Sequence, residues 1–533
     1  MPGRSSACFA VALILVLCAA CNGESSKRGN RLVVAAITTD PGQLNTAITT
    51  NGSVHNAGGL LYDGLVALDE AVKPLPALAE RWEVENKGAL YRFHLRKDVR
   101  WHDGKPFTAA DVRFTFEELL LKFHSRARAS LAPALDHIAT PDQFTVEFHF
   151  RRPYAPLLQQ LDEEEAPILP RHVFAGQDPL RNPANVAPIG TGPYRFVSYV
   201  GGSEIRYAAN DRYFRGAPAV REVILRIIPD AGIQVLALEK GEVDWLFGVP
   251  GPERNRLRRD RRFRLLQTRG VSGSSNCIST IGFNLDKRIF QDVRFRRAVA
   301  HAVDRRQFLD RVLFGEGSVA GAPISSGIAF AHAAGLAMPE LDTTRTARLL
   351  DSIGWRRSPN GMRASSGIGG TADGTPLTVR FTAMPGQAQY GDLLRAQLRA
   401  VGIDVRIEVL EPAVFAQQIF TARDFDLALV AYCNGTDPEI GVRRQYVSSN
   451  IAPVPFSNLA AYRNAVVDSL FDKAASSLEP VERGMIYRQI QEIAVRDQPY
   501  LWLVETLNTR AYNVRCEGFN TSSHFAATAK CTR

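Results

Sequence analysis

The sequence predicts an α/β protein built from two lobes. Apolar strand patterns alternate with amphipathic helix patterns, the alternation occurs in two separate blocks, and no motif recurs at a fixed period. At 533 residues the chain is too long for one hydrophobic core, so two or three domains are expected. An apolar fraction of 45% and a charged fraction of 22% are ordinary for a globular protein.

The first block starts with a buried strand at 31–37, a short β-branched run that ends in the turn sequence TTDPG. Alternating apolar and polar side chains predict two further strands at 90–96 and 144–150. Between them, Thr108 and Asp111 form a capping-box signature at the start of a helix with one apolar face. This part of the chain therefore mixes helices with strands.

Residues 188–199 combine a turn rich in glycine and proline with an alternating strand, and 220–228 is another strand. The sequence IQVLALEKGEVDWL predicts a helix, a turn and a short strand. Seven arginines then crowd the eleven residues 254–264. Only Phe263 accompanies them, so the aromatics of a nucleic-acid site are missing, and a solvated helix face followed by a strand is preferred. Contact with anionic lipid head groups is the remaining functional alternative.

The second block continues the alternation. A strong amphipathic pattern predicts one helix over 292–313, with arginines opposite its apolar face. The run LTVRFTA at 377–383 begins another series of strands and helices, in which 424–432 is a buried strand. Two helices at 466–478 and 483–497 then precede a last strand, YLWLVE.

The N-terminus has the three parts of a secretory signal peptide. Arg4 precedes an apolar run of about 14 residues at 7–20, which is too short to span a bilayer and ends in small residues. Cys18 and Cys21 have the CxxC spacing of a redox dithiol or half a zinc site, but both lie at the edge of this leader. Export is therefore preferred, and a disordered apolar N-terminus is the alternative.

Once residues 1–20 are removed, four cysteines remain besides Cys21: Cys277, Cys433, Cys516 and Cys531. An even number in an exported chain indicates disulfides, and four cysteines allow three pairings. Cys516 and Cys531 close a short loop and are the first expected pair, which leaves Cys277 and Cys433 to pair across a long stretch. The alternative is four unpaired buried thiols.

Signatures of catalysis are missing from the sequence. It contains no GxSxG, HExxH or GxxxxGK[ST] motif, and no two of its ten histidines are three or four residues apart. The acidic run at 162–165 is interpreted as a solvated patch, with Ca²⁺ binding as the alternative. We therefore expect no enzyme activity, no cofactor and no metal site.

One family of binding proteins contains seven segments of this chain in the same order. These segments are LYDGLV, PALAERWEV, YRFHLRKDVRWHDGKPFTAADVRFTFE, GTGPYRF, LEKGEVDW, FRRAVAHAVDR and DFDLALV with a following DPE. The chain thus resembles the extracytoplasmic solute-binding proteins of ABC importers, in the oligopeptide-, dipeptide- and nickel-binding subfamily (family 5). The resemblance implies a type II periplasmic binding protein fold, with two α/β lobes around a cleft and an extra α+β domain inserted in the first lobe.

That layout divides the chain into discontinuous parts. Lobe I comprises 31–62, 187–272 and 500–533, the extra domain comprises 63–186, and lobe II comprises 273–499.

The N-terminus also resembles a lipoprotein signal. In that resemblance, residues 1–20 are removed, Cys21 becomes the lipidated first residue, and 21–30 is a linker. The sequence departs from the usual pattern at Cys18, where a leucine is common. Simple secretion with free release therefore remains the alternative.

The resemblance also bears on the ligand. Peptide-binding members hold the ligand's α-amino group with an aspartate four residues before the proline of a DNGDP-like loop, and counting back from Pro438 places Asn434 there. Ala388 stands where dipeptide-binding members have an arginine for the carboxylate. A free dipeptide would lose two charge-assisted contacts. We therefore expect a longer peptide held by its backbone, or a neutral or modified compound.

The candidate ligand contacts are Thr49, Asn51, Ser53, Gln387, Tyr390, Tyr432, Asn434 and Asp437. Asp437 either meets a cation or forms the turn before the proline, and Tyr432 faces either the cleft or the core. The segment that contains Asn51 is alternatively an ordinary Asn-Gly turn.

We therefore expect a monomeric binding lipoprotein of the periplasm or cell envelope, which is held at the membrane through an N-terminal lipid. It hands a peptide-like small solute to an ABC permease and its ATPase subunits, and it has no nucleic-acid partner. Two alternatives come from other classes. An envelope hydrolase would need a nucleophile and base that the motifs do not display, and a structural or signalling envelope protein would have a vestigial cleft.

Overall fold

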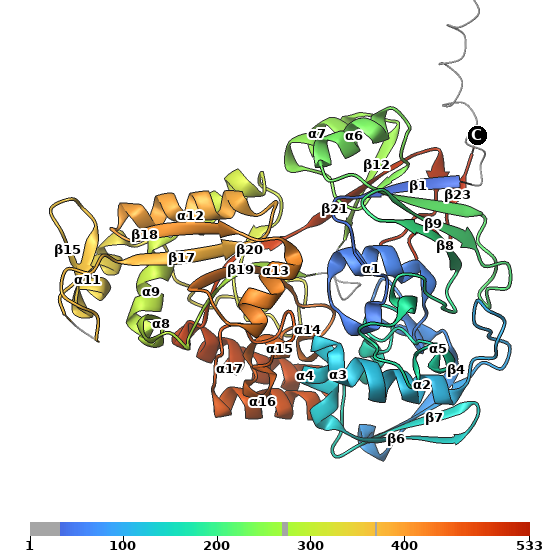
Figure 1. The fold of residues 1–533 in the computed structure, drawn as a ribbon. Coiled ribbons are helices and arrows are strands. Elements are labelled where there is room, and N and C mark those ends of the chain that lie inside the picture. Colours follow the sequence, from blue (N-terminus) through green and yellow to red (C-terminus); the bar gives the residue numbers. More distant parts are fainter. Residues whose placement is uncertain (1–31, 269–275, 368–369, 533) are drawn as a thin grey trace, which may run out of the picture.

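The computed structural model describes residues 32–268, 276–367 and 370–532. The expected signal peptide, Cys21 and the linker lie outside the described residues. Two large mixed sheets form the centres of two lobes, and a four-stranded antiparallel sheet forms a third unit beside the first lobe (Figure 1). No helix among the described residues is long and apolar enough to cross a membrane.

The lobe I sheet has seven strands in the order β12-β21-β11-β1-β10-β9-β8. Its centre is β1 (Leu32–Ile37), which runs parallel to β10 (Glu222–Ile227) and to β11 (Trp245–Leu246). The other strands pair antiparallel: β8 (Tyr194–Val200), β9 (Glu204–Ala209), β12 (Phe263–Thr268) and β21 (Asn508–Asn513). Because both faces of β1 are covered, five of its six residues are buried.

Two helices cover one face of this sheet, α6 (Ala231–Glu239) and α7 (Gly251–Arg259). Val34 on that face shares a core with Leu238 and Leu257. The opposite face of β1 belongs to a larger core that continues into the extra domain. Lobe I and the extra domain are therefore packed as one body.

The extra domain is built on a sheet in the order β4-β5-β7-β6. Its strands are β4 (Ala79–Glu85), β5 (Leu90–Leu95), β6 (Leu135–Asp142) and β7 (Thr145–Phe150). Its helices include α2 (Ala109–Phe114), a π-helical turn (Thr115–Leu120), α3 (Leu121–Phe123), α4 (Ser125–Ala134) and α5 (Arg171–Phe174). The expected capping box is present, since the backbone N–H of Thr108 donates to Asp111 Oδ2 over 2.9 Å.

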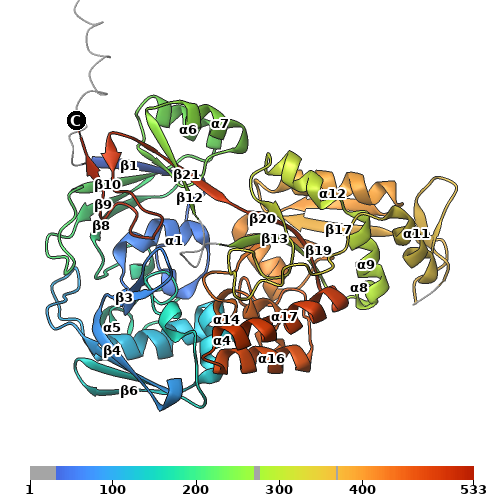
Figure 2. The same ribbon diagram turned by 180° about the vertical axis from the view of Figure 1, so that it is seen from behind.

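The lobe II sheet has the order β14-β20-β13-β19-β17-β18. Its strands are β13 (Cys277–Phe283), β14 (Ser318–Val319), β17 (Thr378–Ala383), β18 (Asp404–Val409), β19 (Leu427–Cys433) and β20 (Tyr500–Thr506). The main helices are α9 (Val293–Ala302), α11 (Thr343–Ser352), α12 (Ala388–Ala400), α16 (Ala465–Ser476) and α17 (Pro480–Asp497). In Figure 2, α16 and α17 lie together at the lower edge of this lobe.

The strand β20 does not lie where the sequence layout put it. The layout assigned 500–533 to lobe I, but β20 pairs with β13 in the lobe II sheet. The chain returns to lobe I only between Thr506 and Asn508, where β21 begins. A strand that is apolar on both faces does not reveal from its pattern which sheet it joins.

The expected single helix over 292–313 is also wrong in detail. α9 ends at Ala302, because Val303 adopts extended backbone angles with φ −105° and ψ 118°. Asp304 then caps a second helical segment, and its carboxylate accepts from the N–H groups of Arg306 and Gln307. Apolar residues continue at helical spacing across this break, so the sequence pattern did not show that a second helical segment begins there.

The acidic run at 162–165 is not a solvated patch. Asp162, Glu164 and Glu165 are each at most 5% exposed. Asp162 accepts from the N–H of Glu165 over 2.8 Å, and Glu165 forms an ion pair with Arg126 of α4. Burial raises the pKa of Asp162 well above its usual range. Acidic residues are mostly exposed, but this run is buried because it crosses the contact between the extra domain and its neighbours.

Both expected disulfides are formed. Cys277 and Cys433 are directly opposite each other on β13 and β19. Cys516 and Cys531 are opposite each other on the short strands β22 (Cys516–Glu517) and β23 (Lys530–Cys531). The first disulfide fixes the end of β19, from which the expected ligand loop continues.

Candidate functional site

Three segments that are far apart in sequence meet where the lobes face each other. They are Thr49–Ser53, which leads into the first turn of α1 (Gly52–Gly58), the helix α4, and residues 433–446 with α14 (Pro438–Gly441) and α15 (Arg443–Tyr446). We call this region the lobe junction. The helix α4 lies against α14 and α15 in Figure 1, and Figure 2 shows α4 beside α14 from behind.

Arg444 is the central side chain of the lobe junction and is 2% exposed. Its Nη1 donates to Thr50 Oγ1 over 3.2 Å and to Ser125 Oγ over 3.3 Å. Its Nη2 donates to the carbonyl of Cys433 over 3.3 Å, and its Nε donates to the carbonyl of Gly441. One guanidinium group thus connects lobe I, the extra domain and lobe II.

Arg444 has no carboxylate among its hydrogen-bond partners in the described chain. Burial and the nearby Arg126 lower the pKa of Arg444 to about 9. Its guanidinium also lies over the ring of Tyr432, 5.4 Å from the ring centre. A charge held by neutral oxygens and an aromatic face leaves this side of the lobe junction electropositive.

Arg126 and His124 lie near Arg444, and the ring of His55 lies beside that of His124. Arg126 pairs with the buried Glu165, and its Nη2 also donates to the Cys433 carbonyl over 3.4 Å. His124 is 1% exposed, and neither of its ring nitrogens has a hydrogen-bond partner in the described chain. Burial, His55, Arg126 and Arg444 hold the pKa of His124 well below its usual range, so its ring is neutral.

The predicted residues Thr49, Asn51 and Ser53 do lie at the lobe junction. The carbonyl of Thr49 is 2.8 Å from His55 Nε2, and Asn51 caps α1 by accepting from the N–H of Ser53. The Asn-Gly pair therefore starts a helix rather than a simple turn.

Ser53 also lines a cavity of 140 Å³ at the carboxyl end of β1. Ile37, Thr39, Asn56 and Phe247 are among its other lining residues. Open α/β sheets bind ligands beyond the carboxyl ends of their strands. This cavity therefore lies at the end of the lobe I sheet where such folds have their binding sites.

Asn434, four residues before Pro438, has a side chain that is already engaged. It is 1% exposed, and its Oδ1 accepts from the N–H of Ser325 over 2.8 Å. Its backbone N–H donates to the carbonyl of Asn276 over 3.1 Å. Gly441 packs so closely on this residue that an added Cβ would lie 2.1 Å from the Asn434 carbonyl oxygen.

Asp437 acts within the protein in this structure. Its carboxylate caps α14 by accepting from the N–H of Glu439, and it forms an ion pair with Arg483 over 2.7 Å. Both partners of that pair are buried, at 2% and 7% exposure. Asp437 was expected either to meet a cation or to form the turn before Pro438, and in this structure it forms the turn.

Tyr432 and Tyr390 are core residues here. Tyr432 is fully buried and donates to the carbonyl of Ser457 over 2.6 Å. Tyr390 stacks on Phe308 inside lobe II, and its hydroxyl is 3.1 Å from that of Ser279. Gln387 is half-buried before α12, where its Oε1 accepts from the N–H of Met384. The structure does not bring Tyr390 and Gln387 to the lobe junction.

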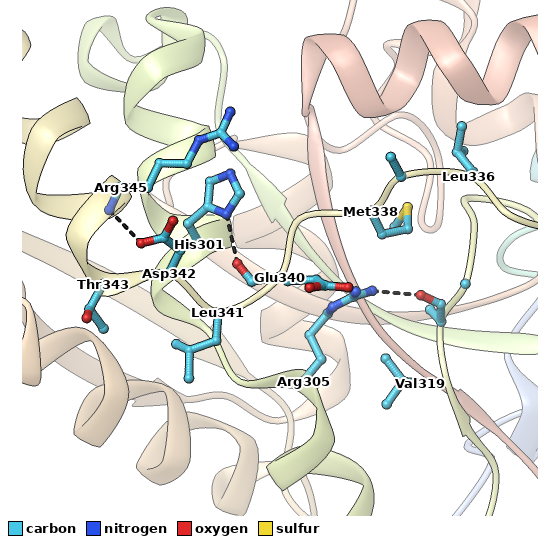
Figure 3. Close-up of a pocket in the computed structure, with 13 residues that line it drawn as sticks. His301, Arg305, Val319, Leu336, Met338, Glu340, Leu341, Asp342, Thr343 and Arg345 are labelled. Atoms are coloured by element: carbon cyan, nitrogen blue, oxygen red, sulfur yellow. Dashed lines mark hydrogen bonds between the residues drawn. The ribbon is translucent and has the colours of Figure 1, made fainter.

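A larger hollow of 850 Å³ lies on lobe II between α9, β14 and α11. Figure 3 shows Arg305, His301 and Glu340 along it. Arg305 donates to the Ala320 carbonyl over 2.7 Å, and His301 Nδ1 is 2.8 Å from the Glu340 carbonyl. None of the predicted ligand contacts lines this hollow.

The lobe junction contains residues that sequence analysis missed, namely Arg126, Arg444 and His124. Each is polar, so its type gives no signal of burial. Arg444 follows Arg443 directly after DPEIGV, and a pair of arginines next to an apolar run was the one available hint.

Two sheet-centred lobes that meet at a polar junction, with an extra domain on one of them, define a two-lobed solute-binding protein. The sequence profile of the bacterial extracellular solute-binding proteins, family 5, matches residues 73–453. The chain belongs to this family.

Curated relatives agree along nearly the whole chain. The oligopeptide-binding protein AppA of Bacillus subtilis is 27% identical over 97% of each chain. Protein XP55 of Streptomyces lividans is 29% identical over 98% of this chain and 93% of its own. Heme-binding protein A of Haemophilus influenzae is 25% identical, covering 93% and 91%.

Solved structures establish the fold as that of type II periplasmic binding proteins. AppA from Bacillus subtilis in complex with a nonapeptide matches with a TM-score of 0.83 at 23% identity, covering 94% of this chain and 99% of its own. NikZ from Campylobacter jejuni in complex with Ni(L-His) matches with a TM-score of 0.80 at 22% identity, covering 94% and 99%. At these sequence identities, the similarity to the two structures establishes the fold alone.

Proposed function

We propose that this protein captures a peptide-like solute between its lobes and delivers it to the permease of an ABC importer. The observation that carries the proposal is the lobe junction, where one buried side chain, Arg444, contacts both lobes and the extra domain. A binding protein of this kind signals ligand capture by lobe closure, so groups that connect the lobes are the expected machinery. Family membership and the similarity to AppA support the same function.

The charges at the lobe junction favour a ligand without a free α-ammonium anchor. Three buried carboxylates in or beside the lobe junction already face an arginine: Glu165 with Arg126, Asp437 with Arg483 and Glu439 with Arg443. Asn434 is neutral and engaged with Ser325. A ligand's ammonium group that met one of these three carboxylates would have to break its ion pair, whereas ligand carbonyl oxygens would not. We therefore favour a longer peptide bound through its backbone, or a neutral or modified compound.

The first experiment is native mass spectrometry of the gently purified protein, followed by denaturation and identification of whatever is released. A released peptide or modified peptide supports the proposal. If the protein carries nothing and binds no member of a peptide library, the peptide part of the proposal is wrong.

A second experiment tests the missing anchor. Isothermal titration would compare one peptide of five to nine residues with its N-acetylated form. We expect similar affinities for the two forms, because Asn434 offers no charge to the ammonium group. In the variant Asn434→Asp, the free peptide should gain about tenfold or more over the acetylated one, as a charged hydrogen bond contributes about 1.5–3 kcal/mol. A strong preference of the unmodified protein for the free amino terminus would contradict the anchor argument.

We further propose that Cys21 carries a lipid that holds the protein at the membrane. The support is the apolar leader that ends in small residues before Cys21, followed by a polar segment. The variant Cys21→Ser should appear in the soluble fraction of fractionated cells, while Cys18→Ser should remain with membranes. Sedimentation of Cys21→Ser with membranes to the same extent as the unmodified protein would exclude lipidation as the anchor.

A further inference from the structure

The arginine-rich run at 254–264 occupies a defined place in the lobe I sheet. β1 is parallel to β11, β11 is antiparallel to β21, and β21 is antiparallel to β12. β1 and β12 therefore run in the same direction and begin at the same edge of the sheet, which we call the N-terminal edge. Three spacings of about 4.8 Å put the start of β12 about 14 Å from the start of β1.

The turn between α7 and β12 lies on the N-terminal edge, since α7 ends at Arg259 and β12 begins at Phe263. We call residues 256–264 the basic turn. It contains six arginines and one acidic residue, and all six arginines are exposed. Figure 1 shows α6, α7 and the start of β1 along the same side of lobe I.

Part of this charge is not neutralised. Arg256 pairs with Glu239 and Glu253, and Arg262 pairs with Asp260. Arg259 and Arg261 form no ion pair within the described part of the chain. A solvated helix face usually mixes charges of both signs, whereas a block of like charges is more typical of an interaction surface.

An exposed apolar side chain accompanies the basic turn. Val514 is 43% exposed, and its backbone N–H donates to the carbonyl of Arg262 over 2.9 Å. Basic residues with apolar side chains between them are the composition of a membrane-surface contact. A nucleic-acid contact would instead need aromatic side chains for stacking, and Phe263 is 3% exposed.

The position of the basic turn also matches the proposed lipid anchor. From Cys21 to Leu32 the chain advances by eleven residues, which span no more than about 40 Å when fully extended. The N-terminal edge would therefore stay close to the bilayer in the lipidated protein. An acyl anchor and a basic patch together hold a protein far more firmly than either alone. The closeness of the N-terminal edge to the bilayer depends on the proposed anchor, whereas the charges of the basic turn are independent of it.

We propose that the basic turn binds anionic lipid head groups and so orients lobe I on the membrane surface. The arginines would face the lipid phosphates as exposed cations, and Val514 would lie at the level of the head groups. This surface is separate from the lobe junction, so it can act while a solute is bound.

The test uses the chain from residue 21 onward with Cys21→Ser, so that no lipid contributes to binding. Sedimentation with vesicles of equal parts phosphatidylglycerol and phosphatidylcholine is compared with pure phosphatidylcholine. We expect binding to the anionic vesicles only, and loss of binding at about 0.5 M salt, where charges are screened within a few ångströms. Neutralising three basic residues at an anionic surface should weaken partitioning about a hundredfold.

The neutralised variant carries Arg259→Gln, Arg261→Gln and Arg264→Gln. The matched control carries Arg348→Gln, Arg399→Gln and Arg406→Gln, three exposed arginines of lobe II. The control should bind within about twofold of the parent chain. Its basic turn is intact, and salt screens the charges of that turn to the same extent as in the parent. Equal loss in both variants, or no preference for anionic vesicles, would overturn the proposal. Binding only to membranes that contain an ABC permease would overturn it in favour of a protein partner.

Discussion

Arg444 of α15 and Thr50 before α1 are 394 positions apart in the chain and are joined by a hydrogen bond of 3.2 Å. The bond runs between lobe II and lobe I, so it exists only while the lobes are together. Ser125 of the extra domain accepts from the same Nη1 atom. One guanidinium group therefore lies between three parts of the protein.

Arg444→Gln should favour the open arrangement of the lobes. The substitution removes hydrogen bonds from a charged donor, each of which contributes about 1.5–3 kcal/mol. We expect a larger radius of gyration in solution scattering and a ligand affinity at least about tenfold lower. Thr50→Val should give a smaller change in the same direction, and Arg406→Gln on the surface of lobe II should give none. Unchanged scattering and ligand affinity in Arg444→Gln would show that Arg444 does not hold the lobes together.

Asp437→Asn should destabilise the fold more than it affects ligand contacts. The substitution leaves the buried Arg483 without its carboxylate partner, and breaking one side of a buried pair costs about 3–5 kcal/mol. Chemical denaturation would show the loss in the free energy of unfolding. The double variant Asp437→Asn with Arg483→Met should be less destabilised than the sum of the single ones. A stable Asp437→Asn variant that no longer binds ligand would instead indicate that Asp437 takes part in ligand binding.

Local patterns were enough to predict strands of lobe I and of the extra domain. Alternation at 90–96 and 144–150 and the buried run at 31–37 correspond to β5, β7 and β1. Sheet membership was harder, because β20 is buried on both faces and its pattern suits either lobe. The break at Val303 was missed because apolar residues continue at helical spacing on both sides of it.

The lobe junction could be predicted only in part. The segment around Asn51 and the loop at Asn434 were expected near the cleft from family order, and the structure brings both to the lobe junction. Arg126, Arg444 and His124 were not expected, because burial of a charged or polar residue follows from tertiary contacts that no local pattern encodes. For the same reason, Tyr390 was expected to contact the ligand and Tyr432 was undecided between cleft and core, whereas both lie in the core of lobe II.

The half-buried ring of His102 should make stability fall in mild acid. Its Nδ1 accepts from the N–H of Gly190 over 3.1 Å, and its Nε2 donates to the carbonyl of Gly192 over 3.0 Å. Burial lowers the pKa of His102 from 6.5 to about 4. The unfolded chain therefore binds this proton first, and the stabilisation is full above pH 6.5 and disappears as the pH falls through 4.

The free energy of unfolding, measured by urea titration at several pH values, should thus lose about 3 kcal/mol through this group. His102→Asn should flatten the pH dependence between 6.5 and 4. Identical pH profiles for His102→Asn and the parent protein would show that His102 is not the titrating group.

The two disulfides should differ in how much they stabilise the protein. Cys277–Cys433 closes a loop with a sequence separation of 156, and Cys516–Cys531 closes one of 15. Chain entropy in the unfolded state then assigns about 5 kcal/mol to the first and about 3 kcal/mol to the second. Urea titration of the paired variants Cys277→Ser/Cys433→Ser and Cys516→Ser/Cys531→Ser would measure both. Because Cys433 directly precedes Asn434, the first variant should also weaken ligand binding, whereas the second should not. Equal affinities in both variants would show that the loop is fixed by Ser325 and Asn276 without the disulfide.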